Sequence, residues 1–120
     1  MAGKVKAKKS LDSVEKILQL VKNSLDDGKA EDVIIIDLEG KSSIASYMIV
    51  ASGNSNRHVA SLAENLQLKL KENGCLSIAE GLEKADWVLV DAYDVIIHIF
   101  RPEVREFYSL EKMWSAVKPR

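Results

Sequence analysis

The chain has 120 residues, of which 47% are hydrophobic and 29% are charged, as in an ordinary soluble globular protein that folds as one domain. Its 17 basic and 18 acidic residues leave a net charge of −1, which argues against nonspecific nucleic-acid binding by the protein as a whole, because such binding depends on a strong positive excess. The single cysteine, Cys75, excludes an intrachain disulfide and a cysteine-based metal site, and the lack of a long apolar run predicts a cytoplasmic protein with no membrane span.

The N-terminal segment has the only obvious charge asymmetry. Residues 1–9 lack apolar periodicity, so we expect a disordered basic tail. Solvation of a frayed end is the favoured interpretation of its lysines, and weak attraction to RNA is the alternative. Residues 10–116 are then expected to form one domain, followed by a C-terminal tail at residues 117–120. The lysines of the basic tail are Lys4, Lys6, Lys8 and Lys9.

Helical and strand patterns alternate along the rest of the chain. A helix is expected from Ser10, because apolar residues recur at spacings of three and four as far as Leu25. The order α-β-β-α-β-β-β-α predicts a single α/β (α+β) domain, in which helices pack on a mixed five-stranded sheet. The later elements are a mostly buried strand at 32–38, a strand at 47–52, a helix from 55 or 56 to Gly74, a weak strand at 75–79, strands at 87–90 and 95–100, and a helix from Pro102.

The last two strands are apolar on both faces. Ile96, His98 and Phe100 point to one side of the last strand, and its other residues point to the opposite side. Trp87 and Leu89 likewise share one face of the preceding strand. Three helices are few for covering both faces of a sheet, so we expect one apolar face to be left for a partner.

Two polar groups raise the alternative of an enzyme. Asp37 and Glu39 have the spacing that directs two carboxylates toward a metal ion, and the Ser52–His58 turn lies at a helix N-terminus, where anions can bind. A nucleotidyltransferase would need a third carboxylate on a neighbouring strand, and helix capping explains the turn equally well. We therefore expect no metal site and no cofactor, with residual nucleotide binding or nucleotidyl transfer as the alternative function.

Seven short motifs follow one another from Asp32 to Trp114, within a resemblance that covers roughly residues 11–115. In their order and spacing they resemble the ribosomal silencing factors, also called the Iojap family. Each motif is short, but their joint order is specific. They begin at Asp32 (DVIIIDL), Gly40 (GKSS), Ser52 (SGNSNRHV), Glu80 (EG), Ala85 (ADWVLVD), Asp94 (DVIIHI) and Tyr108 (YSLEKMW).

The resemblance implies a nucleotidyltransferase-like fold that lacks transferase chemistry, and hence a protein that is not an enzyme. It implies binding to the large ribosomal subunit through its protein L fourteen, steric blockage of subunit association, and repression of translation under starvation or in stationary phase. It also implies a homodimer in the free state. By their places in the matching motifs, the partner-binding residues would be Trp87, Leu89, Asp91, His98, Tyr108, Leu110 and Lys112.

The chain departs from the family pattern in one turn. The family usually has Leu-Gly where this chain has Ala92 and Tyr93, so a bulky tyrosine replaces a glycine in the turn. Of the aromatic residues, we expect Trp87 to face the partner and Trp114 to lie in the core.

Overall fold

The computed structural model describes the backbone of residues 2–38, 40 and 45–108, and the side chains of residues 14–38, 40 and 45–105. The element order is the predicted one, which confirms a mixed α+β domain. No helix within this part of the chain is long and apolar enough to cross a membrane. The elements are α1 (Ala2–Asp27), β1 (Glu31–Asp37), β2 (Tyr47–Ser52), α2 (Asn56–Glu72), β3 (Ile78–Glu80), β4 (Trp87–Ala92), β5 (Val95–Phe100) and α3 (Pro102–Tyr108).

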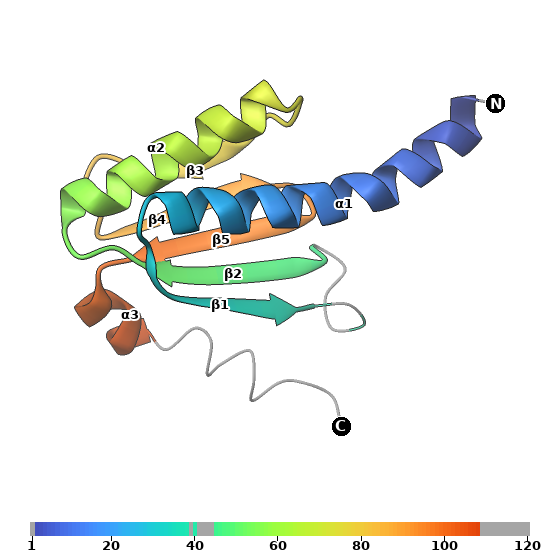
Figure 1. The fold of residues 1–120 in the computed structure, drawn as a ribbon. Coiled ribbons are helices and arrows are strands. Elements are labelled where there is room, and N and C mark those ends of the chain that lie inside the picture. The colour runs from blue at the N-terminus through green and yellow to red at the C-terminus, as the bar shows by residue number, and fades with distance from the viewer. Residues whose placement is uncertain (1, 39, 41–44, 109–120) are drawn as a thin grey trace.

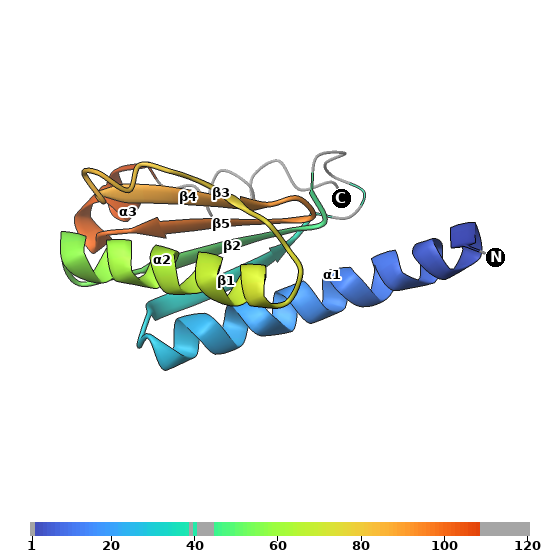
Figure 2. The ribbon, with the colours of Figure 1, turned by 90° about the horizontal axis from the view of Figure 1, so that it is seen from above.

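The five strands form one mixed sheet in the order β1-β2-β5-β4-β3. β2 and β5 run parallel, and the other neighbouring strands are antiparallel. Figures 1 and 2 show α1 and α2 side by side on one face of the sheet, with α3 at one end of the opposite face. The described helices therefore cover one face of the sheet broadly and the other face only at one end.

The main hydrophobic core lies between the sheet and the helices α1 and α2. Side chains that alternate along β4 and β5 point into it, as their period of two requires. The stripe of apolar residues predicted on α2 is buried there. Its fully buried members from the helices are Val21, Leu25, Val59, Ala63, Leu66 and Leu70, and those from the last two strands are Val88, Val90, Ala92, Val95, Ile97 and Ile99.

Both ends of α2 lie where the sequence predicts them. The hydroxyl oxygen of Ser55 accepts a hydrogen bond from the backbone N–H of His58 at 3.0 Å, which caps the helix. At the other end Gly74 has a φ of 84°. This conformation lets the backbone N–H of Cys75 donate a hydrogen bond to the carbonyl of Leu70 in the last turn of α2, which ends the helix.

The prediction of a mostly buried first strand is wrong. β1 is an edge strand, and Val33, Ile34 and Ile35 are 37–39% exposed. A β-branched run looks the same in sequence whether it lies at the edge or in the middle of a sheet. The pairing of β1 with β2 shifts register between Glu31 and Ile34, and Asp32 has a φ of 49°. Such an irregularity is a common protection of an exposed edge.

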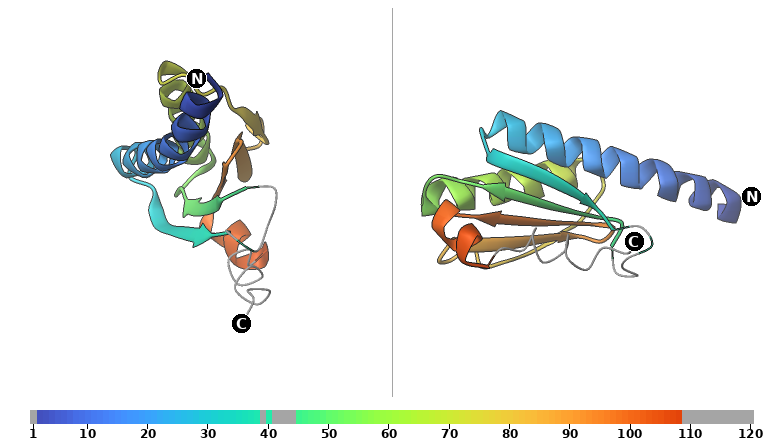
Figure 3. Two further views of the ribbon diagram at one scale, coloured as in Figure 1. Left: turned by 90° about the vertical axis from the view of Figure 1, so that its right-hand side faces the viewer. Right: turned by 90° about the horizontal axis from the view of Figure 1, so that it is seen from below.

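The N-terminal segment also differs from the expectation. Residues 1–9 were expected to be disordered, yet α1 begins at Ala2 and continues without a break to Asp27. Alanine and lysine are good helix formers, and a helix that is already packed at its C-terminal end extends without a new nucleation step. The N-terminal part of α1 projects beyond the ends of the strands (Figure 3).

The turn between β4 and β5 accommodates the departure from the family pattern. Tyr93 has a φ of 69°, in the left-handed region that glycine adopts most readily. A carboxylate oxygen of Asp91 accepts a hydrogen bond from the backbone N–H of Tyr93 at 2.9 Å and supports this conformation. The hairpin keeps its register, with Ala92 opposite Val95.

Candidate functional site

The face of the sheet opposite α1 and α2, called the open face below, carries four of the residues that the sequence selects. Trp87, Leu89 and Asp91 alternate along β4, and His98 lies beside Leu89 on β5. All four are partly exposed, whereas the residues between them on β4 are buried against the helices. The register of the hairpin therefore brings four residues from two motifs onto one surface.

An aromatic cluster forms the centre of this surface. The ring of Trp87 stacks on that of Phe100 with 4.9 Å between their centroids, and the ring of His98 lies 6.0 Å from that of Phe100. The indole Nε1–H of Trp87 donates a hydrogen bond to Nδ1 of His98 at 3.0 Å. These contacts fix the orientation of the indole while part of its surface stays exposed.

The same hydrogen bond fixes the protonation state of His98. An indole N–H can only donate, so Nδ1 must offer its lone pair and the ring proton must lie on Nε2. Burial lowers the pKa of His98 to about 4. The ring is therefore neutral at physiological pH, and the open face carries an uncharged aromatic centre.

A second, smaller core supports the β1 and β2 side of the open face. Because of this second core, the open face is apolar along most of its width. The partly exposed section of the open face is centred on β4 and β5. The buried members of the second core are Leu38, Ala45, Met48, Val50 and Phe100, and Ile36, Trp87, Ile96 and Val104 pack against them.

Helix α3 is fastened to one end of the open face by a buried polar contact. Nη1 of Arg105 donates a hydrogen bond to the hydroxyl of Ser52 at 2.8 Å, and the two residues are 8% and 1% exposed. Arg101, just before the helix, forms ion pairs with Asp86 at 3.3 Å and with Glu103 at 3.1 Å. These contacts join the ends of β2 and β5 to the residues that precede β4.

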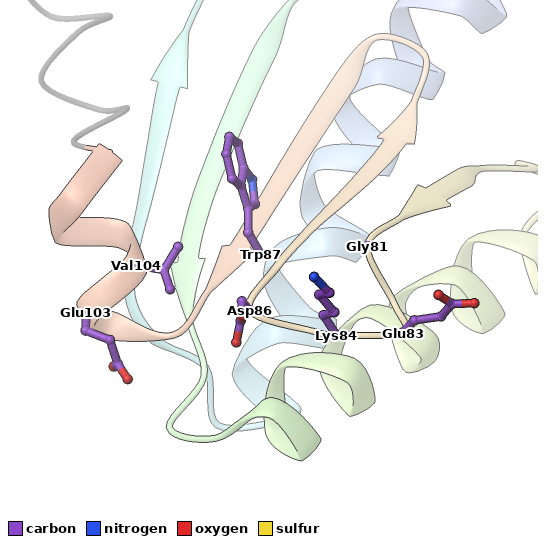
Figure 4. Close-up of a pocket in the computed structure, with 7 residues that line it drawn as sticks. All are labelled: Gly81, Glu83, Lys84, Asp86, Trp87, Glu103 and Val104. Atoms are coloured by element: carbon purple, nitrogen blue, oxygen red, sulfur yellow. The ribbon is translucent and has the colours of Figure 1, made fainter.

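A cavity of about 650 Å³ opens between α3 and the start of β4. Figure 4 shows Trp87 and Asp86 between α3, which carries Val104 and Glu103, and the segment that leads into β4. The walls of the cavity are therefore partly aromatic and aliphatic, and its rim is mainly acidic. Such a cavity suits the apolar stem and positive head of a basic side chain. The remaining lining residues are Gly81, Glu83 and Lys84.

The groups considered for an enzyme do not come together. Asp37 lies opposite Tyr47, at the start of β2, whereas Ser52 ends that strand. Five residues of strand separate their positions by about 17 Å, at ~3.3 Å per residue. Glu39 lies outside the described residues, and among those described no group of three or more His, Cys, Asp or Glu side chains is placed to hold a metal ion.

The hydrogen bonds in the polar turn before α2 stabilise the fold. Nδ1 of His58 accepts a hydrogen bond from the N–H of Asn54 at 2.9 Å, and Nε2 lies 2.8 Å from the carbonyl oxygen of Gly28, to which it donates. Asn56 donates to the carbonyl of Lys84 and to Asp86, both at 2.7 Å. The favoured interpretation of this turn as a capping segment is thereby supported.

The terminal motif is only partly visible. Tyr108 is described as the last residue of α3 without its side chain, and Leu110, Lys112 and Trp114 lie outside the described residues, as does the expected tail at 117–120. Sequence reasoning missed the Ser52–Arg105 contact. The two partners of that contact are 53 residues apart, so no local pattern links them.

Comparisons with known proteins agree on one family. The family model described as "Ribosomal silencing factor during starvation" matches residues 11–120. A Zymomonas mobilis protein named ribosomal silencing factor is 55% identical over 102 residues, which cover 84% of this chain and 77% of that protein. A crystal structure from Chromobacterium violaceum has a TM-score of 0.83 and 42% identity, covering 89% of this chain and 90% of that one.

A more distant relative comes from Mus musculus. It is named mitochondrial assembly of ribosomal large subunit protein 1, and it is 33% identical over 90 residues, which cover 72% of this chain and 40% of that protein. The similarity thus extends from bacterial to mitochondrial proteins whose names refer to the ribosome.

Proposed function

Because the chain belongs to the ribosomal silencing factor, or Iojap, family, we propose that its open face docks on protein L fourteen of the large ribosomal subunit and sterically blocks association with the small subunit. Family membership supports a ribosome-associated role in repressing translation. Under the proposal the protein acts in the cytoplasm, when nutrients are limiting or in stationary phase, by occupying a surface and without chemistry.

The observation that carries the proposal is the partly exposed aromatic cluster on the open face. Tryptophan is enriched among the residues that dominate interface binding energies, particularly where it is surrounded by contacts that exclude water. Trp87 is held by Phe100 and His98, so little conformational freedom is lost when a partner covers it. Leu89 lies beside this cluster and extends its apolar surface.

Charges around the cluster favour a basic partner. Asp91 lies on the open face, and Glu80 pairs with Leu89 at the adjacent edge strand β3. Asp86 and Glu103 rim the cavity next to Trp87 and share the single positive charge of Arg101, which leaves a net negative charge there. An acidic rim around an apolar centre selects a complementary surface and speeds its encounter with the protein. The mouse relative, whose name refers to the large subunit, supports that subunit as the partner.

The terminal motif extends the proposed interface. Tyr108 is the last residue of α3, and Leu110 and Lys112 come after it in the sequence. Helix α3 is held at one end of the open face through Arg105. The same apolar face would also serve a homodimer in the free state. Dimer formation and ribosome docking would then exclude each other, because one surface cannot contact two partners at once.

Sedimentation with purified subunits tests where the protein binds. We expect it to cosediment with isolated large subunits and to stay at the top of the gradient with isolated small subunits. Large subunits from which protein L fourteen has been removed should retain little of it. Equal recovery with both subunits, or undiminished binding without protein L fourteen, would contradict the proposed docking site.

A further inference from the structure

The first ten residues of α1 form an arm that lies apart from the folded body. We call residues 2–11 the N-terminal arm. Among the described side chains of α1, the first that packs against the main core is Ile17. At ~1.5 Å per residue the arm is about 15 Å long, and it projects past the ends of the strands in Figures 1 and 2 and in the right view of Figure 3. The family model begins only at residue 11, so nearly all of the arm lies outside the part of the chain that matches the family.

Charge is divided sharply between the arm and the rest of the chain. Residues 1–11 contain four of the 17 basic residues and none of the 18 acidic ones. Residues 12–120 therefore carry 13 basic and 18 acidic residues, a net charge of −5. The near-neutral total thus conceals a positive arm on a negative body. A polyanion would repel that body and attract the arm.

The arm is also electrostatically unfavourable as an isolated helix. Lys4 and Lys8 are spaced i and i+4, a spacing at which like charges destabilise a helix. Positive charge near a helix N-terminus opposes the macrodipole, and the first turn of α1 holds no acidic residue. Bound anions would relieve both effects. Binding to a polyanion would therefore stabilise the arm as a helix.

We propose that the N-terminal arm binds the phosphate backbone of ribosomal RNA next to the docking site on the large subunit. This inference rests on the proposed function, because it requires the open face to place the body on that subunit. Lysine contacts to phosphate are independent of base sequence, and the arm has no aromatic residue on which a base would stack. The arm adds affinity and orientation, while the open face supplies specificity.

The dependence of affinity on salt tests the arm directly. The variant Lys4→Gln, Lys6→Gln, Lys8→Gln and Lys9→Gln removes its charge and keeps residues of similar helix propensity. Each phosphate contact contributes about −0.7 to −0.9 to the slope of log K against log salt concentration. We expect a plot of affinity for purified large subunits against KCl concentration to be shallower by about 3 in the variant, with roughly tenfold weaker binding at physiological salt.

A second variant separates the arm from net charge alone. Replacing Lys16, Lys22, Lys29 and Lys71, which are exposed lysines of the folded body, by glutamine changes the total charge equally. We expect this variant to keep most of the wild-type slope. An unchanged slope in the arm variant, or an equal loss in both variants, would overturn the role of the arm while leaving docking intact. Absence of binding by the wild-type protein would overturn the proposed function itself, and the role of the arm with it.

Discussion

Replacing Trp87 by alanine is expected to weaken binding to the large ribosomal subunit by about 2 kcal/mol or more, which corresponds to about 30-fold in Kd. The indole is oriented by its hydrogen bond to His98 and by stacking on Phe100, and it lies between the exposed β4–β5 surface and the adjacent cavity. Its removal would take away the partly exposed aromatic centre of the open face. Fluorescence anisotropy of labelled protein, titrated with large subunits, measures the change.

Two further variants separate loss of the interface from loss of the fold. Leu89→Ala shortens a neighbouring side chain of the open face and should also weaken binding, by a smaller factor. Leu68→Ala shortens a side chain that is 54% exposed on α2, on the helix-covered side, and should leave Kd unchanged. Thermal unfolding of each variant shows whether it is folded. Wild-type affinity in a folded Trp87→Ala protein would remove Trp87 from the interface.

Acidification is expected to destabilise the fold through His98. Burial lowers the pKa of this residue from 6.5 to about 4 in the folded protein. Between these values the unfolded chain binds a proton that the folded protein does not, so the free energy of unfolding falls as the pH drops through this window. The stability that His98 contributes is complete above about pH 6.5, and about 2–3 kcal/mol of it should be lost near pH 4, at ~1.4 kcal/mol per pKa unit.

The variant His98→Asn isolates this effect from the titration of carboxylates. The amide oxygen of asparagine can accept the indole hydrogen bond but does not titrate. Urea unfolding at a series of pH values from 7.5 to 4 should show a smaller loss of stability in the variant than in the wild type. Parallel curves for the two proteins would show that His98 titrates normally, and that its ring is not held neutral by the open face.

The sequence predicts the interior of this fold better than its edges. The bounds of β2 and β5 match the apolar runs at 47–52 and 95–100, because both strands are central and their composition reflects burial. β1 has an equally β-branched sequence but lies at the edge. Strand order depends on contacts between segments far apart in the chain, which no local period encodes. The N-terminal arm was missed for a related reason, since its helix has no apolar stripe.

The candidate site divides in the same way. Alternation predicts that Trp87 and Leu89 share one face of their strand, and in the structure they do. Asp91 and His98 join them on that face through the length of β4 and the register of the β4–β5 hairpin. The hydrogen bond from Trp87 to His98 depends on hairpin register, and register depends on a turn with a tyrosine at positive φ. The cavity beside Trp87 depends on α3, whose position is fixed by Arg105 and Ser52. Neither feature has a signature within a short stretch of sequence.

Subunit joining is the measurement that tests the central claim most directly. Purified large subunits are saturated with the protein, mixed with small subunits, and resolved on a sucrose gradient. We predict that the fraction of joined ribosomes falls sharply with the wild-type protein and with Leu68→Ala, and much less with Trp87→Ala at the same concentration. Undiminished joining with large subunits that are demonstrably saturated would contradict steric silencing through the open face.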